Sequence, residues 1–150
     1  MNRLTRNDVN MNLALVVAQR GTCLRAKVGA VAVLDGRVVA TGYNGSPKGQ
    51  PHCTSDSCTP HNHCPNSIHA EANLIAYSAR KGVKLEGSTI YITHSPCRKC
   101  SELIIQAGIK EVYYLQPYSG TDWELLLTSG IELTRLHEKS SKPFTTVQFG

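Results

Sequence analysis

Two short polar motifs constrain most strongly what this chain can fold into. His69-Ala70-Glu71 is followed, after twenty-four residues, by Pro96-Cys97-Arg98-Lys99-Cys100. Each motif lies where a helix is expected to begin, because helical patterns run over residues 68–81 and from Pro96 to Gly108. Helix N-termini carry partial positive charge and unpaired N–H groups, which favour thiolate over thiol. The sequence therefore predicts a fold in which two helix starts meet over one site.

The residue types at that site indicate a catalytic zinc ion. His69, Cys97 and Cys100 offer the imidazole and thiolate ligands that zinc prefers, and three protein ligands leave a fourth position for water. Zinc lowers the pKa of such a water toward neutrality, and Glu71 would then move the protons. H-x-E followed by P-C-x-x-C is the signature of zinc nucleobase deaminases.

Simpler interpretations account for fewer of these residues. Cys97 and Cys100 could form a redox pair or half of a structural zinc knuckle. His69 could cap a helix, and Glu71 could be a favourable charge in its first turn. A redox pair does not need the upstream motif and a closed knuckle does not need Glu71, so the catalytic interpretation is preferred.

Length, composition and charge are those of a small globular protein. The 150 residues fit one domain, spanning residues 1–150, and are 41% hydrophobic and 18% charged. The longest apolar run near the N-terminus, Leu13 to Ala18, is too short for a signal sequence or a membrane span. We therefore expect a cytoplasmic protein without a membrane partner, in which six cysteines are better interpreted as metal ligands than as disulfides.

The net charge indicates an anionic partner. The formal charge is +5, but it is spread along the chain, and only nine residues are Tyr, Phe or Trp. Stacking platforms for a single strand are therefore few. A phosphorylated small molecule explains this basicity as well as nucleic acid does.

Periodicity and turn signals predict an α/β fold with a mixed sheet and helices on both faces. Thr5, Asn7 and Asp8 are N-cap candidates for a first helix that ends near Arg20-Gly21, and Asp35-Gly36 is a strong hairpin signal. Further helices are expected over residues 68–81, 96–108 and 122–129, and strands over 27–34, 37–42, 88–93, 110–115 and 131–136. Residues 43–67 form a long loop, which is usually functional or cross-linked.

Beyond the two motifs, the chain resembles the cytidine-deaminase-like superfamily and, within it, the deoxycytidylate (dCMP) deaminases. The resemblance covers roughly residues 5–136. It is carried by residues 20–25 (RGTCLR), 28–31 (VGAV), 42–49 (GYNGSPKG), 67–73 (SIHAEAN), 87–93 (GSTIYIT) and 106–109 (QAGI), and by Tyr113-Tyr114 with Tyr118. The G-Y-N-G and T-C-x-R segments distinguish dCMP deaminases from tRNA adenosine deaminases and free cytidine deaminases.

The resemblance implies a three-layer α/β/α sandwich with a mixed five-stranded sheet. It also implies zinc-dependent hydrolysis of dCMP to dUMP and ammonia, which supplies dUMP for thymidylate synthesis. The family is homo-oligomeric, commonly hexameric, and many members are activated by dCTP with Mg²⁺ and inhibited by dTTP. Two other functions remain to be compared with this one: a polynucleotide (tRNA or single-stranded DNA) base deaminase, and a zinc-stapled nucleic-acid-binding module. Neither is favoured, because the chain lacks a concentrated basic or aromatic tract and the binding module leaves Glu71 unused.

The same resemblance implies a set of substrate-binding residues. They are Arg25, Asn44, Ala70, His94, Ser95 and Tyr118. The amide of Asn44 offers a hydrogen-bond acceptor and donors to a sugar or phosphate, although a turn asparagine is often only structural.

The chain departs from its relatives directly after Tyr118. Relatives often carry basic residues there, whereas this chain continues with Ser119, Gly120, Thr121 and Asp122. The 5′-phosphate contacts are therefore expected from Arg25, Lys27, Lys48 or a neighbouring subunit.

Cysteines outside the catalytic motif suggest a second, structural zinc site. Its candidate ligands are Cys23, Cys53, Cys58, His63 and Cys64, which is five candidates for four positions. Some dCMP deaminases carry such a site at positions matching Cys23 and Cys53. The alternative is that one or two of these thiols are inert and buried.

Arg80 is the candidate for an allosteric residue. It ends the helix that begins at His69 and Glu71, where a cation is also an ordinary partner of the helix dipole. The sharper hypothesis is that Arg80 senses a nucleotide effector or a subunit contact.

Overall fold

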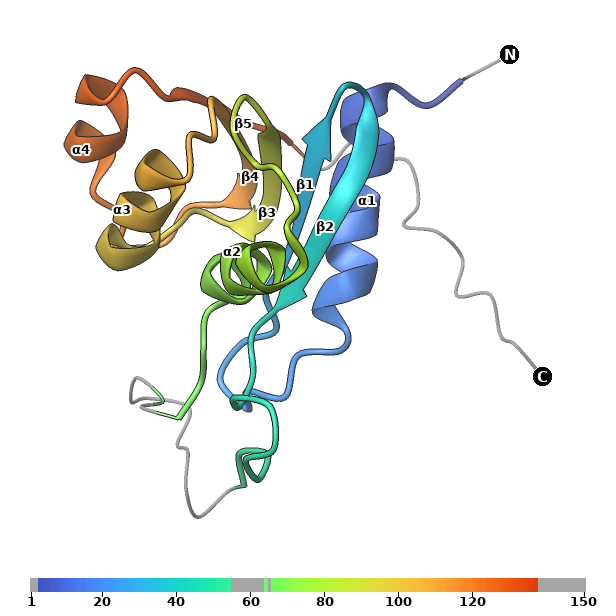
Figure 1. The fold of residues 1–150 in the computed structure, drawn as a ribbon, viewed down its shortest axis with the longest axis vertical. Coiled ribbons are helices and arrows are strands. Elements are labelled where there is room, and N and C mark those ends of the chain that lie inside the picture. The colour runs from blue at the N-terminus through green and yellow to red at the C-terminus, as the bar shows by residue number, and fades with distance from the viewer. Residues whose placement is uncertain (1–2, 55–63, 65, 138–150) are drawn as a thin grey trace.

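A mixed sheet of five strands forms the centre of the computed structural model, which describes residues 3–54, 64 and 66–137 (Figure 1). The strand order is β2-β1-β3-β4-β5. The strands are β1 (Gly29–Leu34), β2 (Arg37–Tyr43), β3 (Thr89–His94), β4 (Glu111–Gln116) and β5 (Glu132–Arg135). The helices are α1 (Arg6–Ala18), α2 (Ala70–Lys81), α3 (Arg98–Gln106) and α4 (Trp123–Thr128).

Strand pairing places the ends of β3 and β4 side by side. β1 pairs antiparallel with β2 and β3, while β3, β4 and β5 are parallel. Asp35 and Gly36 have φ values of 52° and 76°, the left-handed conformation that a two-residue hairpin turn requires. The crossovers through α3 and α4 bring the carboxyl ends of β3 and β4 to one edge, where His94 pairs with Gln116.

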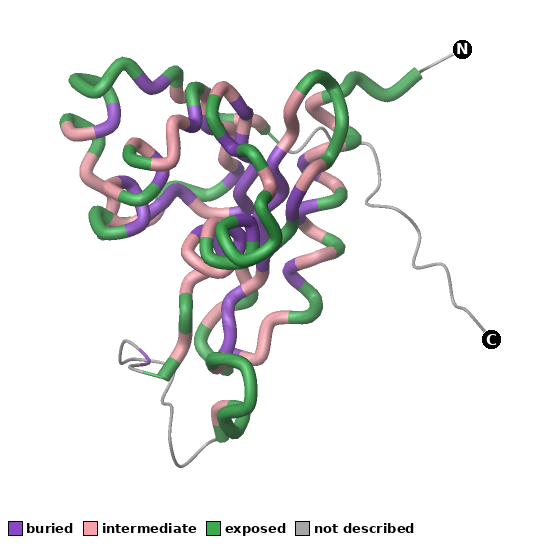
Figure 2. The backbone as a smooth tube through the Cα atoms, viewed as in Figure 1, coloured by how far each residue is buried: buried purple, intermediate pink, exposed green. Residues whose placement is uncertain are grey.

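Helices cover both faces of the sheet, so the predicted three-layer α/β/α sandwich is confirmed. Along β3, Tyr91 packs toward α1 while its neighbours Ile90 and Ile92 pack toward the other helices, as side chains of a strand alternate. The α1 side contains Met11, Ala14, Val31, Tyr91 and Leu115. The opposite side includes Leu74 of α2, Ile104 of α3 and Leu126 of α4. Buried residues concentrate in the strands between these layers (Figure 2).

Local signals set most element ends. Thr5 and Asp8 form a capping box at the start of α1, and Gly82 (φ 69°) ends α2 in the left-handed conformation. Some boundaries differ from the prediction. Strand β1 begins at Gly29 rather than Lys27, because the N–H of Val28 donates to the side chain of Asn44. Helix α3 begins at Arg98, because Cys97 is its N-cap.

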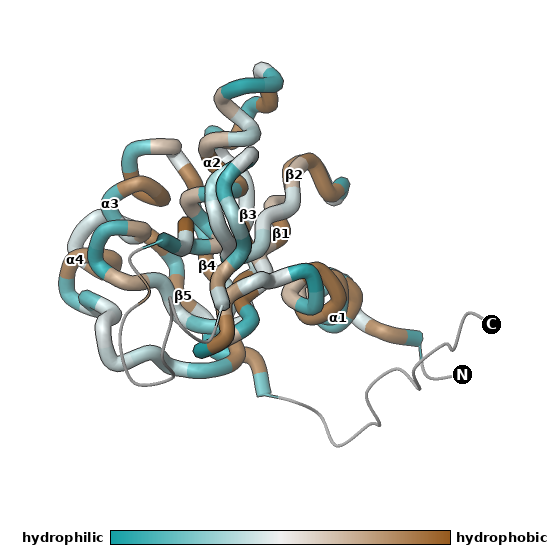
Figure 3. Tube along the Cα trace, turned by 90° about the horizontal axis from the view of Figure 1, so that it is seen from below, coloured by the Kyte–Doolittle hydropathy of each residue, from teal (hydrophilic) through white to brown (hydrophobic). Residues whose placement is uncertain are grey.

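The outer face of α1 remains partly apolar. Val9, Leu13 and Val16 are exposed along it, and hydrophobic residues appear along this helix in Figure 3. In the part of the chain that the structure describes, no helix has the length and apolar character needed to cross a membrane.

Replacing Gly29 should test how closely α1 packs on β1. A Cβ at Gly29 would lie 2.0 Å from the carbonyl oxygen of Ala14 and 2.6 Å from the amide nitrogen of Ala18. Both are helix backbone atoms that cannot rotate away, so Gly29→Ala should lower the free energy of unfolding by about 1–3 kcal/mol. Urea unfolding measures this change, with the exposed Val38→Ala as a control expected to stay within about 0.5 kcal/mol. An unchanged stability of Gly29→Ala would contradict the packing described.

Candidate zinc site and substrate cavity

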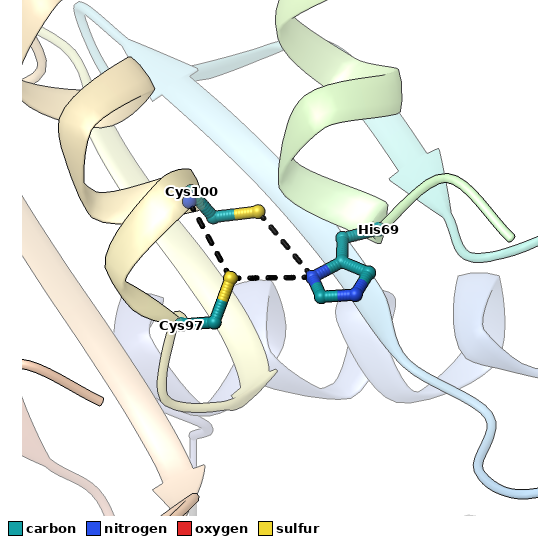
Figure 4. A group of neighbouring side chains, drawn as sticks. All are labelled: His69, Cys97 and Cys100. Carbon is teal, nitrogen blue, oxygen red and sulfur yellow. Dashed lines mark hydrogen bonds between the residues drawn. The ribbon is translucent and has the colours of Figure 1, made fainter. Parts of the chain in front are cut away.

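The starts of α2 and α3 bring one imidazole and two thiols together. His69 is the N-cap of α2, Cys97 is the N-cap of α3, and Cys100 lies in the first turn of α3. The Nδ1 atom of His69 lies 3.4 Å from Cys97 Sγ and 3.5 Å from Cys100 Sγ (Figure 4). One donor atom from each residue lies within 4.8 Å of the others. The structure thus brings together the metal ligands that the sequence predicts.

Hydrogen bonds within this group stabilise negative charge on Cys97. The pKa of the Cys97 thiol falls to about 3, because Cys100 and His69 donate hydrogen bonds to its sulfur. The same contacts raise the pKa values of Cys100 and His69, which are the donors. The backbone N–H of Cys100 also points at Cys97 Sγ over 3.5 Å. An imidazole nitrogen beside two sulfurs, of which that of Cys97 favours the thiolate, is a donor set suited to Zn²⁺ and poorly suited to a hard cation such as Mg²⁺.

Glu71 follows His69 by two residues and is almost fully buried. It is the second residue of α2 and is 3% exposed. Burial raises the pKa of the Glu71 carboxyl to about 7, since desolvation disfavours the charged form. A carboxyl with a pKa near neutrality is well matched to both taking and giving a proton.

A cavity of about 320 Å³ opens beside the ligand group, and Glu71, His69 and Cys97 line it. The six residues predicted to bind substrate all line it as well: Arg25, Asn44, Ala70, His94, Ser95 and Tyr118. Lys27 and Lys48 are not among its lining residues, and Arg80 lies exposed in the last turn of α2. In the described part of the chain, Arg25 is therefore the Lys or Arg residue that reaches the cavity.

Asn44 holds the segment that carries Arg25. Its Oδ1 accepts the N–H of Val28 over 2.8 Å, and its Nδ2 donates to the carbonyl of Ala26 over 2.7 Å. These bonds use one lone pair and one N–H of an amide that has two of each. Asn44 thus combines the structural role of a turn asparagine with a position at the cavity wall.

His94 and Ser95 each contact a threonine that was not among the predicted site residues. Thr93 Oγ1 lies 3.0 Å from His94 Nδ1, and burial lowers the pKa of His94, which favours the neutral imidazole. Ser95 Oγ lies 2.7 Å from Thr121 Oγ1 and accepts the N–H of Tyr118 at the same distance. No local signal identifies Thr121, because its contact exists only after the loop behind β4 folds back onto β3.

The predicted second group of ligands is only partly described. Cys23 and Cys64 are buried and cluster with Cys53, and the sulfurs of Cys53 and Cys64 lie 3.3 Å apart. The pKa of Cys53 is raised, first because it shares a hydrogen bond with Cys64. Cys58 and His63 lie outside the described residues. Within the described residues these thiols do not form the tight three-donor group seen at His69.

Comparisons with known proteins identify relatives of this chain. The family model for the cytidine and deoxycytidylate deaminase zinc-binding region matches residues 5–116. ComE operon protein 2 of Bacillus subtilis is 45% identical over 119 residues, which cover 79% of this chain and 63% of that protein's length. The deoxycytidylate deaminase of Enterobacteria phage T4 is 33% identical, over 87% of this chain and 89% of the phage protein.

A solved structure shares both the fold and part of the sequence. It is the dCMP deaminase of cyanophage S-TIM5 in complex with dCMP and dUMP, which superimposes with a TM-score of 0.80 and 36% identity. The match covers 91% of this chain and 100% of the phage chain. The likeness therefore extends over the sheet, the helices and the site between them.

Proposed function

The chain belongs to the cytidine and deoxycytidylate deaminase zinc-binding family, and we propose that it hydrolyses dCMP to dUMP and ammonia. The observation that carries this proposal is the meeting of His69, Cys97 and Cys100 beside buried Glu71 in one cavity. The phage S-TIM5 relative, which binds dCMP and dUMP, supports the choice of substrate.

In the proposed reaction, His69, Cys97 and Cys100 would hold the zinc ion. Zinc bound there would lower the pKa of water so that hydroxide is available near neutral pH. Glu71 takes one proton from the attacking water and delivers it to N3 of cytosine. It then takes the second proton from the new hydroxyl on C4 and delivers it to the leaving amine. The C4–O bond forms, the C4–N bond breaks and ammonia leaves, so that dUMP is the product. Burial of Glu71 supports this role, because it gives the carboxyl a pKa near the working pH.

Arg25 is the proposed partner of the 5′-phosphate. It lines the cavity, whereas Lys27 and Lys48 do not, and residues 119–122 after Tyr118 include no Lys or Arg. A guanidinium group matches the geometry of phosphate oxygens. Asn44 supports this placement, because it fixes the backbone of Ala26 and Val28 directly after Arg25.

The other cavity residues are proposed to orient the base and the sugar. Ala70 is the first residue of α2, so its backbone N–H has no partner within the helix and can donate to the substrate. Neutral His94, the remaining N–H of Asn44 and the ring of Tyr118 complete the cavity.

A second, structural zinc ion is part of the proposal. Cys23, Cys53 and Cys64 gather where the loop after β2 returns toward α2, which supports Cys23, Cys53 and Cys64 as ligands, with Cys58 or His63 as the fourth. Cys23 and Cys64 also line the substrate cavity, so this ion would stabilise one of its walls.

Regulation and assembly complete the proposal. We infer a cytoplasmic homo-oligomer, most simply a hexamer, activated by dCTP with Mg²⁺ and inhibited by dTTP. Arg80 supports a link to the site because it lies at the exposed end of the helix whose first turn holds Glu71. An effector or a subunit contact at Arg80 would act by favouring one arrangement of α2.

Replacing Glu71 by Gln should separate metal binding from proton transfer. Glu71→Gln keeps the shape of the side chain but cannot take a proton, so turnover of dCMP should fall about 10²–10⁴-fold while the zinc content stays unchanged. Ammonia release and elemental analysis measure the two quantities. Glu102→Gln is the matched control, because Glu102 is an exposed carboxylate of α3 paired with Arg98. Turnover of Glu71→Gln within tenfold of the wild type would reject the assignment.

Elemental analysis should find two zinc ions per chain. Cys23→Ser and Cys53→Ser should each lose one ion and unfold at a lower temperature, because a structural site contributes its binding energy to folding. Glu71→Gln serves as the control that keeps both ions. One zinc ion per chain, unchanged in both cysteine variants, would rule out the second site.

Rates of dCMP turnover should respond to nucleotides through Arg80. Magnesium-dCTP should activate the wild type and dTTP should reverse the activation, with an effect of about 5–150-fold on apparent affinity. Arg80→Glu should abolish this response, whereas Lys81→Glu, at the neighbouring exposed cation, should retain it. Hyperbolic kinetics that neither nucleotide alters would contradict the regulatory proposal.

A further inference from the structure

The loop after β4, residues 117–122, is joined to the segment before α3 by hydrogen bonds that involve the hydroxyl groups of Ser95 and Thr121. The N–H of Tyr118 donates to Ser95 Oγ over 2.7 Å, and Ser95 Oγ lies 2.7 Å from Thr121 Oγ1. Ser95 is 3% exposed. The Ser95 hydroxyl thus contacts the loop at two residues, Tyr118 and Thr121.

A second set of contacts joins the loop to Arg98, three residues after Ser95. The N–H of Arg98 donates to the carbonyl of Gly120 over 3.2 Å, and the guanidinium group of Arg98 pairs with Asp122. Cys97, a proposed zinc ligand, lies between Ser95 and Arg98, the two residues that bond the loop. The loop and the segment that carries Cys97 are therefore joined at both ends.

The ring of Tyr118 lies against the backbone of Gly120. A Cβ at Gly120 would be 2.6 Å from Cε1 and 3.1 Å from Cζ of Tyr118. The φ of Gly120 is not in the left-handed range, so space, and not backbone conformation, is what a side chain there would lack. This contact is independent of the hydroxyl pair, because it involves the ring of Tyr118, whereas Ser95 bonds the backbone N–H of the same residue.

We propose that Ser95, Thr121 and Gly120 are positioning residues that hold Tyr118 as a preformed wall of the substrate cavity. This role rests on the proposed function for the identity of the substrate, and it differs from direct contact between Ser95 and the nucleotide. A loop side chain that is ordered before binding avoids the entropic cost of immobilising it in the complex. Because the loop 117–122 contains no Lys or Arg, affinity depends more on this wall than on positive charge in the loop.

Amide hydrogen exchange tests the hydrogen bonds between Ser95 and the loop in the absence of substrate. The Tyr118 N–H should exchange at least tenfold faster in Ser95→Ala than in the wild type, and Thr121→Val should have an intermediate effect. Thr121→Ser, which keeps the hydroxyl, should exchange like the wild type, as should Ser119→Ala, which removes an exposed hydroxyl from the same loop. Unchanged exchange at Tyr118 in Ser95→Ala would overturn the proposal.

Kinetics then distinguish positioning from direct contact. Ser95→Ala and Thr121→Val should both raise KM for dCMP several-fold with kcat within about twofold, because a lost binding contact acts on KM. If only Ser95→Ala raises KM, Ser95 contacts the substrate and the positioning role is wrong. Wild-type turnover of dCMP tests the proposed function separately, since the exchange measurement does not depend on it.

A double-mutant cycle tests the role of Gly120. Gly120→Ala should raise KM about tenfold when Tyr118 is present, and less than twofold in a Tyr118→Ala background, where no ring remains to be displaced. Thermal unfolding of each variant identifies any loss of folded protein. An equal effect of Gly120→Ala in both backgrounds would show that Gly120 does not act through Tyr118.

Discussion

At Gly42 the backbone of α2 approaches β2 so closely that no side chain fits between them. A Cβ on Gly42 would lie 2.3 Å from the carbonyl oxygen of Ala70, the first residue of α2. This contact places the start of the helix, with His69 and Glu71, over the sheet. The start of α3 reaches the same place from β3, because only Ser95, Pro96 and Cys97 separate strand and helix. The proposed zinc site exists because both helix starts are held there by the packing beneath them.

The electrostatics of the site follow from this placement. Two helix N-termini point at His69, Cys97 and Cys100, and their partial positive charge favours thiolate. The pKa of Glu71 is instead raised, because the carboxyl is buried and its charged form is disfavoured. The start of α2 thus carries His69, whose pKa is raised by its hydrogen bond with Cys97, and a carboxyl whose pKa is about 7. Arg25, Asn44 and Tyr118, which we propose to bind the substrate, reach the cavity from other segments of the chain.

The sequence predicted features that depend on local chemistry and missed those that depend on loop closure. Asp35-Gly36, Gly82 and the Thr5 capping box each act within a few residues, so the hairpin turn and the helix ends could be located. The ligand types of the two motifs, their positions at helix starts and the known deaminase signature predict the meeting of His69 with the cysteines. By contrast, the contact of Ser95 with Thr121 joins residues that are 26 positions apart, and no pattern in either segment indicates it. The hydrogen bonds of Asn44 with Ala26 and Val28 could not be predicted from the sequence for the same reason.

In the function proposed above, the cavity beside the two helix starts deaminates a small nucleotide. Ammonia release from dCMP, deoxycytidine, dCTP and a cytosine-containing oligonucleotide, measured with one zinc-loaded preparation, tests it most directly. Arg25 as the single Lys or Arg lining the cavity of the described residues, with Glu71 beside the ligand group, predicts the highest kcat/KM for dCMP. Turnover of the oligonucleotide or of deoxycytidine with none of dCMP would contradict the account.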